Sequence, residues 1–312
     1  MAYKTSNIER IENDRGIKVG KLNATTIRKI FGGIGASASF GYAVGGQGVT
    51  TMEKYSFSVD GNATDVGDLA DGISRSATSA SSTHGYAAGG GPGTVTIQKW
   101  PFASDTNATD IADLLVGLNA GAGQQSSISG YSSGGDANGT ASNVIQKFPF
   151  AVDANATDVG DLTQSRSFVT GQSSSTHGYS SGGYFHPNTY TTIDKFPFST
   201  DANATSVGNI TYANYGGSGI SSGDNGYHGG GYGPSNRIYK FPFSVDENAT
   251  DIADLTVSRG RPSGSSSSTS GYTAGGSPGG DVIDKFPFSV DANATDVGDL
   301  TQSRLDLSGT QG

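Results

Sequence analysis

The stretch from His177 to Gly183 reads His-Gly-Tyr-Ser-Ser-Gly-Gly, and its pattern Gly-Tyr-x-x-Gly-Gly, or a close variant, occurs six times in the 312-residue chain. The tyrosines of the six copies are Tyr42, Tyr86, Tyr131, Tyr179, Tyr227 and Tyr272. A second pattern, Lys-aromatic-x-Phe, starts at Lys54, Lys99, Lys147, Lys195, Lys240 and Lys285, and a third, Asn-Ala-Thr, at Asn62, Asn107, Asn155, Asn203, Asn248 and Asn293. Because the three patterns keep one order in every copy, the chain consists of six repeats of one structural unit.

One repeat reads as four β-strands. Residues 167–175 are small and serine-rich, which suits an inner strand near a central axis, and residues 178–181 form a second strand that a double glycine stops. Residues 192–198 alternate between two faces as a strand requires, with Pro197 marking its end because proline cannot donate to the sheet. A fourth strand is expected at residues 207–210.

Four strands in each of six units predict an all-β fold, a six-bladed β-propeller with four-stranded antiparallel blades over residues 30–312. The units are rich in Gly, Ser, Thr and Asn, which excludes helical repeats. A β-solenoid is the alternative. Partial repeats at residues 17–22 and from Gln302 onward suggest that the two ends overlap to close the ring, and which terminus completes which blade stays open.

The charge is unevenly distributed. Residues 1–30 hold seven basic and three acidic groups, a net charge of +4. Since the whole chain has a net charge of −9, the rest of the chain carries −13. We therefore predict residues 1–29 to be a basic docking segment for a partner protein, which could also supply a closing strand, although a solvated leader is the alternative. An acidic body repels phosphate, so no nucleic acid is expected. No apolar run reaches eighteen residues and no signal-peptide core occurs at the start, so no membrane insertion is expected.

Two resemblances arise from these motifs. The order of serine-rich strand, Gly-Tyr-x-x-Gly-Gly, aromatic strand, and fourth strand followed by arginine resembles the kelch repeat, which implies a kelch-like propeller. The arginines are Arg75, Arg166, Arg259 and Arg304, and two copies have residues 114–119 and 211–214 there instead. The phrase at residues 147–162 and 285–300, Lys-Phe-Pro-Phe-x-x-Asp-x-Asn-Ala-Thr-Asp-Val-Gly-Asp-Leu, is similar to repeats in virion proteins of marine tailed bacteriophages, such as cyanophages. That resemblance implies a phage virion structural protein, associated with a tail or fibre and attached to other virion proteins.

Most motifs have a structural interpretation. Asp153 and Asn155 begin a spacing like that of a calcium loop, but Asp158 and Gln164 stand where Gly and Glu are needed, so a capped turn is favoured. The Asn-Ala-Thr triplets are likewise expected to be turns. Phe148 and its counterparts in the other repeats, Trp100 included, should pack between blades. The chain has no cysteine and no distinctive acidic pair, so we predict no cofactor, no metal and no enzyme, with a carbohydrate-active enzyme as an alternative.

Recognition is predicted on one rim. The connections between second and third strands vary among repeats, and in a meander they share a rim with the connections between blades. These variable loops are residues 47–51, 91–95, 136–143, 184–191, 232–236 and 277–281. The predicted ligand-binding residues are Tyr184, Phe185, His186, Asn188, Tyr190, Tyr232 and Asn236. Exposed rings there could stack on a host-surface glycan or protein, or the loop could simply cover the core. A capsid or tail decoration protein without a ligand is the other alternative.

Overall fold

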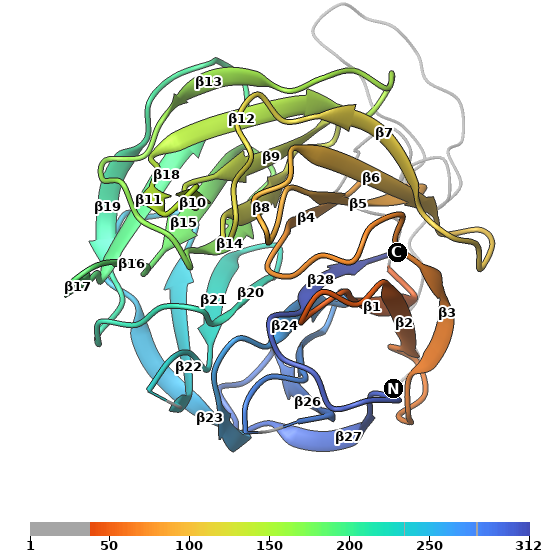
Figure 1. The fold of residues 1–312 in the computed structure, drawn as a ribbon. Helices are drawn as coiled ribbons and strands as arrows, with labels where there is room; N and C mark the ends of the chain where they lie inside the picture. Colours follow the sequence, from red (N-terminus) through yellow and green to blue (C-terminus); the bar gives the residue numbers. More distant parts are fainter. Residues whose placement is uncertain (1–37, 234, 279) are drawn as a thin grey trace, which may run out of the picture. The chain divides into compact units, whose positions relative to one another are not determined.

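The computed structural model describes residues 38–233, 235–278 and 280–312, and these form a closed ring of six four-stranded antiparallel sheets without any helix (Figure 1). The predicted six-bladed all-β propeller is therefore confirmed. Within the described ranges there is no helix with the length and hydrophobicity needed to cross a membrane. The predicted docking segment, residues 1–29, lies outside the described residues.

Each blade is a meander whose first strand lies nearest the ring's centre. Blade I comprises β28 (Ser308–Gln311), β1 (Phe40–Val44), β2 (Thr51–Ser56) and β3 (Thr64–Asp68), and blade II comprises β4 (Ala77–Ala80), β5 (His84–Ala88), β6 (Thr96–Pro101) and β7 (Thr109–Asp113). Blade III comprises β8 (Ala122–Gln125), β9 (Ser129–Ser133), β12 (Val144–Pro149) and β13 (Thr157–Asp161), and blade IV comprises β14 (Thr170–Ser173), β15 (His177–Ser181), β18 (Thr192–Pro197) and β19 (Thr205–Asn209). Blade V comprises β20 (Ser218–Ser221), β21 (Asn225–Gly229), β22 (Ser235–Pro242) and β23 (Thr250–Arg259), and blade VI comprises β24 (Ser263–Ser266), β25 (Ser270–Ala274), β26 (Val282–Pro287) and β27 (Thr295–Asp299).

Two variable loops carry small hairpins of their own. They are β10 (Asp136–Ala137) with β11 (Thr140–Ala141) in blade III, and β16 (Tyr184–Phe185) with β17 (Asn188–Thr189) in blade IV. In blade IV the four main strands overlap the predicted ranges, with ends that differ by up to three residues, and Pro197 is the last residue of its strand.

The C-terminus closes the ring. Strand β28 pairs with β1, with Tyr42 opposite Thr310, and the Gly312 N–H donates to the Phe40 carbonyl at 3.0 Å. All four strands of blade I thus come from residues 40–68 and 308–311. Pairing the two ends of the described chain covers the edge of β1, which is where blade I would otherwise be open.

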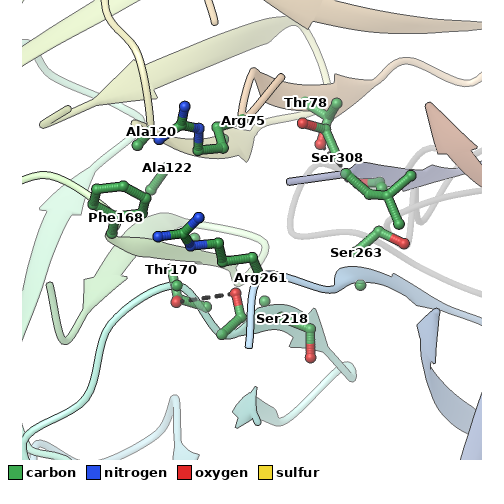
Figure 2. A pocket seen from close by; sticks show the side chains of 18 of the residues that line it. Arg75, Thr78, Ala120, Ala122, Phe168, Thr170, Ser218, Arg261, Ser263 and Ser308 are labelled. Carbon is green, nitrogen blue, oxygen red and sulfur yellow. Dashed lines mark hydrogen bonds between the residues drawn. The ribbon is translucent and has the colours of Figure 1, made fainter. Parts of the chain in front are cut away.

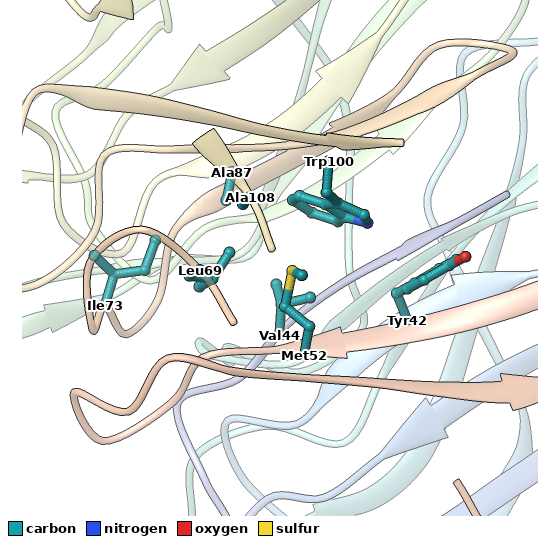
Figure 3. Packing of buried hydrophobic residues seen from close by; sticks show 8 residues of the cluster. All are labelled: Tyr42, Val44, Met52, Leu69, Ile73, Ala87, Trp100 and Ala108. Carbon is teal, nitrogen blue, oxygen red and sulfur yellow. The ribbon is translucent and has the colours of Figure 1, made fainter. Parts of the chain in front are cut away.

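Aromatic side chains fill the interfaces between blades. Tyr179 of blade IV stacks on Phe243 of blade V, with centroids 4.7 Å apart, and lies 5.5 Å from Phe241. Figure 3 shows the corresponding contact between blades I and II, where Tyr42 faces Trp100. The glycine before each tyrosine makes room for the ring of the third strand, since a Cβ at Gly178 would lie 2.3 Å from Phe196. The predicted packing role of these aromatics is confirmed.

The lysine and asparagine patterns join neighbouring blades. Lys147 Nζ lies 2.5 Å from Asp201 Oδ1 of blade IV, and Asn203 Oδ1 accepts the N–H of Asp161 at 3.1 Å. The same lysine–aspartate pair recurs at all six interfaces: Lys54–Asp105, Lys99–Asp153, Lys147–Asp201, Lys195–Asp246, Lys240–Asp291 and Lys285–Asp60. The Asn-Ala-Thr segments are therefore turns that hydrogen-bond to the preceding blade. In the calcium-like spacing, the Asp153 oxygen binds Lys99 and the Asn155 oxygen accepts the N–H of Asp113.

Three blades contain a buried ion pair at the arginine position. The pairs are Arg166 with Asp194, Arg259 with Asp284, and Arg304 with Glu53. The corresponding positions of the other blades hold uncharged residues: Ile73 and Gln98, Leu118 and Gln146, and Asn214 and Tyr239. The prediction for Arg75 was wrong, because Ile73 fills this position and Arg75 lies two residues further on. Within the six described blades, a buried arginine occurs only where an acid is present to neutralise it, as the cost of burying a lone charge requires.

Candidate functional site

Six residues, one from each connection between blades, form a closed circle of backbone hydrogen bonds. The N–H of each residue donates to the carbonyl of the previous one at 2.7–3.0 Å, and the Arg75 N–H closes the circle on the Asp306 carbonyl. We call this circle the mouth ring, and its members are Arg75, Ala120, Phe168, Gly216, Arg261 and Asp306. The backbone is equivalent at all six positions while the side chains differ, so the repeats differ in side chain at the mouth ring.

The mouth ring has an unusual backbone conformation. All six residues have positive φ angles, between 53° and 64°. This left-handed conformation costs a residue with a side chain roughly 1–2 kcal/mol, whereas glycine adopts it freely. Gly216 shows that glycine fits, yet five positions carry a side chain. Strain of this kind is typical of functional sites, which makes the mouth ring a candidate.

A pocket of about 130 Å³ lies inside the mouth ring (Figure 2). Hydroxyl side chains of the inner strands line it, among them Thr78, Thr170 and Ser263. Further in, the inner strands approach so closely that a Cβ on Gly171 would lie 2.1 Å from the Gly123 carbonyl oxygen. A cavity of roughly 150 Å³ accepts benzene, so the pocket has room for about one six-membered ring.

Charged groups stand at the opening of the pocket. Arg75 Nε and Arg261 Nη1 each lie 3.6 Å from Asp306 Oδ1, which is too far for a hydrogen bond. Arg75 Nε, Arg261 Nε and Asp306 Oδ1 are buried and have no hydrogen-bond partner among the described residues. Asp306 is only 8% exposed, and the arginine side chains are 28% and 30% exposed. The opening therefore offers two guanidinium groups and one carboxylate, a net charge of +1.

Aromatic rings extend from the mouth ring toward the variable loops. Tyr184, Tyr215 and Tyr232 stack in succession, with centroids 4.9 and 4.7 Å apart, and we call them the tyrosine ladder. Phe168 meets Tyr215 edge-on at 5.6 Å, and the Arg261 guanidinium lies 5.4 Å from the Phe168 ring and 5.5 Å from the Tyr232 ring. The tyrosine ladder and the pocket are therefore parts of one surface.

Backbone contacts fix the variable loops to the mouth ring. Tyr184 exchanges two hydrogen bonds with Ser167, the residue before Phe168, and the Tyr232 N–H donates to the Tyr215 carbonyl at 2.8 Å. Burial raises the pKa of the Tyr215 hydroxyl, and its neighbours Tyr232 and Tyr184 raise it further. Tyr215 therefore stays protonated at neutral pH and its hydroxyl can donate a hydrogen bond.

The structure divides the predicted ligand-binding residues into two groups. Tyr184 and Tyr232 belong to the tyrosine ladder, and His186 Nδ1 lies 2.9 Å from the Tyr184 hydroxyl. Of the others, Phe185 and Asn188 pair within the small hairpin, Tyr190 is half-buried where the loop returns to the blade, and Asn236 is half-buried in β22. None of the seven lines the pocket itself, and Tyr184 and Tyr232 are connected to it through Tyr215 and Arg261.

The sequence analysis missed five residues of this surface. They are Arg75, Phe168, Tyr215, Arg261 and Asp306. Each belongs to a different repeat or connection, so nothing in the sequence shows that they meet. This repeat position varies between arginine, alanine, phenylalanine, glycine and aspartate, but the positions beside it vary as well, so the sequence does not single it out.

A scan of protein-family models finds no match to the chain, and a search of curated proteins finds none either. The fold and the site themselves define the class of protein. The described chain is a six-bladed β-propeller with a cationic, aromatic-flanked pocket inside its mouth ring.

Proposed function

We propose that the chain is a virion structural protein of a bacteriophage, associated with a tail or fibre, and that it recognises a glycan or protein on the host surface. The observation that carries the recognition role is the mouth ring with its tyrosine ladder. Five side chains are kept there in a conformation that glycine would adopt without strain, and the variable loops are fixed to the same residues. Variable side chains on a rigid scaffold are what specific recognition requires.

Binding accounts for this surface better than hydrolysis does. Glycoside hydrolysis usually requires two carboxyl groups on either side of the bond to be cleaved. Among the described residues that line the pocket, Asp306 is the single acid. Its neighbours are two arginines, which suit the binding of a ligand rather than a proton transfer between two acids.

The virion part of the proposal rests on the likeness of the repeat phrase at residues 147–162 to repeats of phage virion proteins. In this proposal the basic segment at residues 1–29 docks on other virion proteins and the variable rim faces outward. Deleting residues 1–16 should leave a folded propeller that no longer joins the particle. Normal incorporation of the shortened chain would overturn the docking role.

Recognition can be tested on the purified full-length chain. We expect it to bind host cells or an array of host-surface glycans, and we expect Tyr215→Ala to weaken that binding. Tyr212 is a matched control, because it is an exposed tyrosine three residues away that is not in the tyrosine ladder. A chain that occupies particles fully yet binds no host surface would instead be a decoration protein.

A further inference from the structure

We infer that the pocket inside the mouth ring binds the carboxylate of an acidic sugar, such as a uronic acid, at the end of a glycan. This rests on the proposed recognition function and specifies its ligand. The conclusion follows from three features of the pocket: its charge, its unpaired polar atoms and its size.

The net positive charge and the unpaired N–H donors at the opening favour an anionic ligand. Arg75 and Arg261 together carry one more charge than Asp306 neutralises, and the Nε of each has no hydrogen-bond partner among the described residues. The planar guanidinium group binds carboxylates through two parallel hydrogen bonds. Phe168 lies between the two arginines, 5.3 and 5.4 Å from them, and so fixes their positions. A carboxylate that enters the opening can therefore meet both.

The unpaired carboxylate oxygen of Asp306 requires a ligand that also donates a hydrogen bond. Asp306 Oδ1 is buried and has no hydrogen bond within the described part of the chain. Sulfate would serve the arginines but has no hydrogen to donate to Asp306, and doubly charged phosphate would place more negative charge against Asp306 than a carboxylate does. A sugar acid satisfies both requirements, because its carboxylate accepts from arginine and its adjacent hydroxyl groups donate to Asp306. The serine and threonine hydroxyls of the wall suit the remaining polar edge of such a ring.

The size and surroundings favour a sugar over an acidic peptide. The pocket of about 130 Å³ has room for roughly one six-membered ring. An aspartate or glutamate side chain would bring a carboxylate on an aliphatic stem, without hydroxyl groups beside it. Next to the pocket, Tyr232 is 54% exposed and can stack on the following sugar of the chain.

A purely structural role of the two arginines is the competing explanation, since they connect the ends of the ring through Asp306. The 3.6 Å separations and the partial exposure of both arginines make these ion pairs weak contributors to stability. Arg→Gly substitutions also remove the strain of a positive φ angle. R75G and R261G should therefore fold. Asn138→Gly is the matched control, because Asn138 also has a positive φ angle but lies in the small hairpin of blade III, outside the pocket lining, and the change removes no charge.

The test measures binding of glucuronic acid to the full-length chain by calorimetry or by NMR, with glucose, sulfate and a glutamate-rich peptide as comparison ligands. We expect glucuronic acid to bind better than all three, and R75G and R261G each to weaken its binding at least tenfold, which is the order of a lost charge-assisted hydrogen bond. N138G should bind normally. Y232A should weaken binding of a uronate-ended oligosaccharide but leave the single sugar unaffected.

Three results would overturn the inference: equal binding of glucose, preferential binding of the acidic peptide or of sulfate, or glucuronic acid binding that survives R75G and R261G. If the chain binds host cells but not acidic sugars, the recognition function stands and only the acidic-sugar assignment fails. If it binds neither, both proposals fail.

Discussion

The buried ion pair of blade IV provides a quantitative test of how the repeats are built. Arg166 and Asp194 are both inaccessible to solvent, with Nη2 and Oδ2 2.9 Å apart. Asp194 also accepts hydrogen bonds from the N–H and hydroxyl of Thr163. Arg166→Leu would leave the Asp194 charge buried without its cation, and Asp194→Gln would do the same to Arg166. Removing one partner of a buried pair costs about 3–5 kcal/mol.

The double variant R166L/D194Q reproduces what blade III already contains, Leu118 with Gln146. Gln146 is fully buried and exchanges two hydrogen bonds of 2.9 Å with the backbone of Val116. Replacing a complete buried pair by uncharged residues is often neutral. We therefore expect the double variant to lie within about 1–2 kcal/mol of the native chain, less than either single variant costs.

Urea unfolding of the four proteins measures this comparison, with Lys147→Ala as a control for an exposed pair, which should cost less than about 1 kcal/mol. If the double variant loses as much free energy of unfolding as the two single variants together, the two positions are independent and the matching of charges between blades has another cause.

Three further predictions concern pH, packing and ring closure. Burial lowers the pKa of His228 to about 4 from 6.5, so the folded chain keeps it neutral while the unfolded chain protonates it. The stability that neutral His228 contributes is complete above pH 6.5 and is lost as the pH falls toward 4, a loss of up to about 3 kcal/mol. In thermal melting at a series of pH values, His228→Thr should reduce this loss of stability at low pH. An unchanged pH profile would contradict the assignment. In urea unfolding, Gly171→Ala should destabilise the chain by about 3 kcal/mol, because the added Cβ would meet backbone atoms. The control Gly223→Ala has open space around it and should change stability little. Equal losses of stability in the two variants would refute the close approach of the inner strands. Removing residues 308–312 should expose the edge of β1 and produce aggregation on gel filtration, and a monomeric, normally melting product would show that β28 is not needed for closure.

The sequence predicted those parts of the fold that every repeat carries. Tyr179, Lys195 and Asn203 each have counterparts in all repeats, and each makes the same contact with a neighbouring blade. Their fixed order therefore identified both the strands and the number of blades. The wrong assignment of Arg75 could have been avoided from the sequence. A buried arginine accompanies an acid such as Asp194, and the repeat that follows Arg75 has Gln98 at the position equivalent to Asp194.

The candidate site was less accessible from the sequence. The mouth ring brings together one residue from each of six connections, and its closure depends on the last one, Asp306, reaching the first, Arg75. No local pattern records this contact between distant residues. Tyr215 lies in a connection without the usual arginine, so its place between Tyr184 and Tyr232 became visible only when the blades were arranged in space.

The most direct test of this account is an experimental structure of the full-length chain determined with glucuronic acid. We predict six sheets with β28 as the inner strand of blade I, and a sugar carboxylate within hydrogen-bonding distance of Arg75 and Arg261. A different number of blades, or a sugar bound away from the mouth ring, would contradict the account.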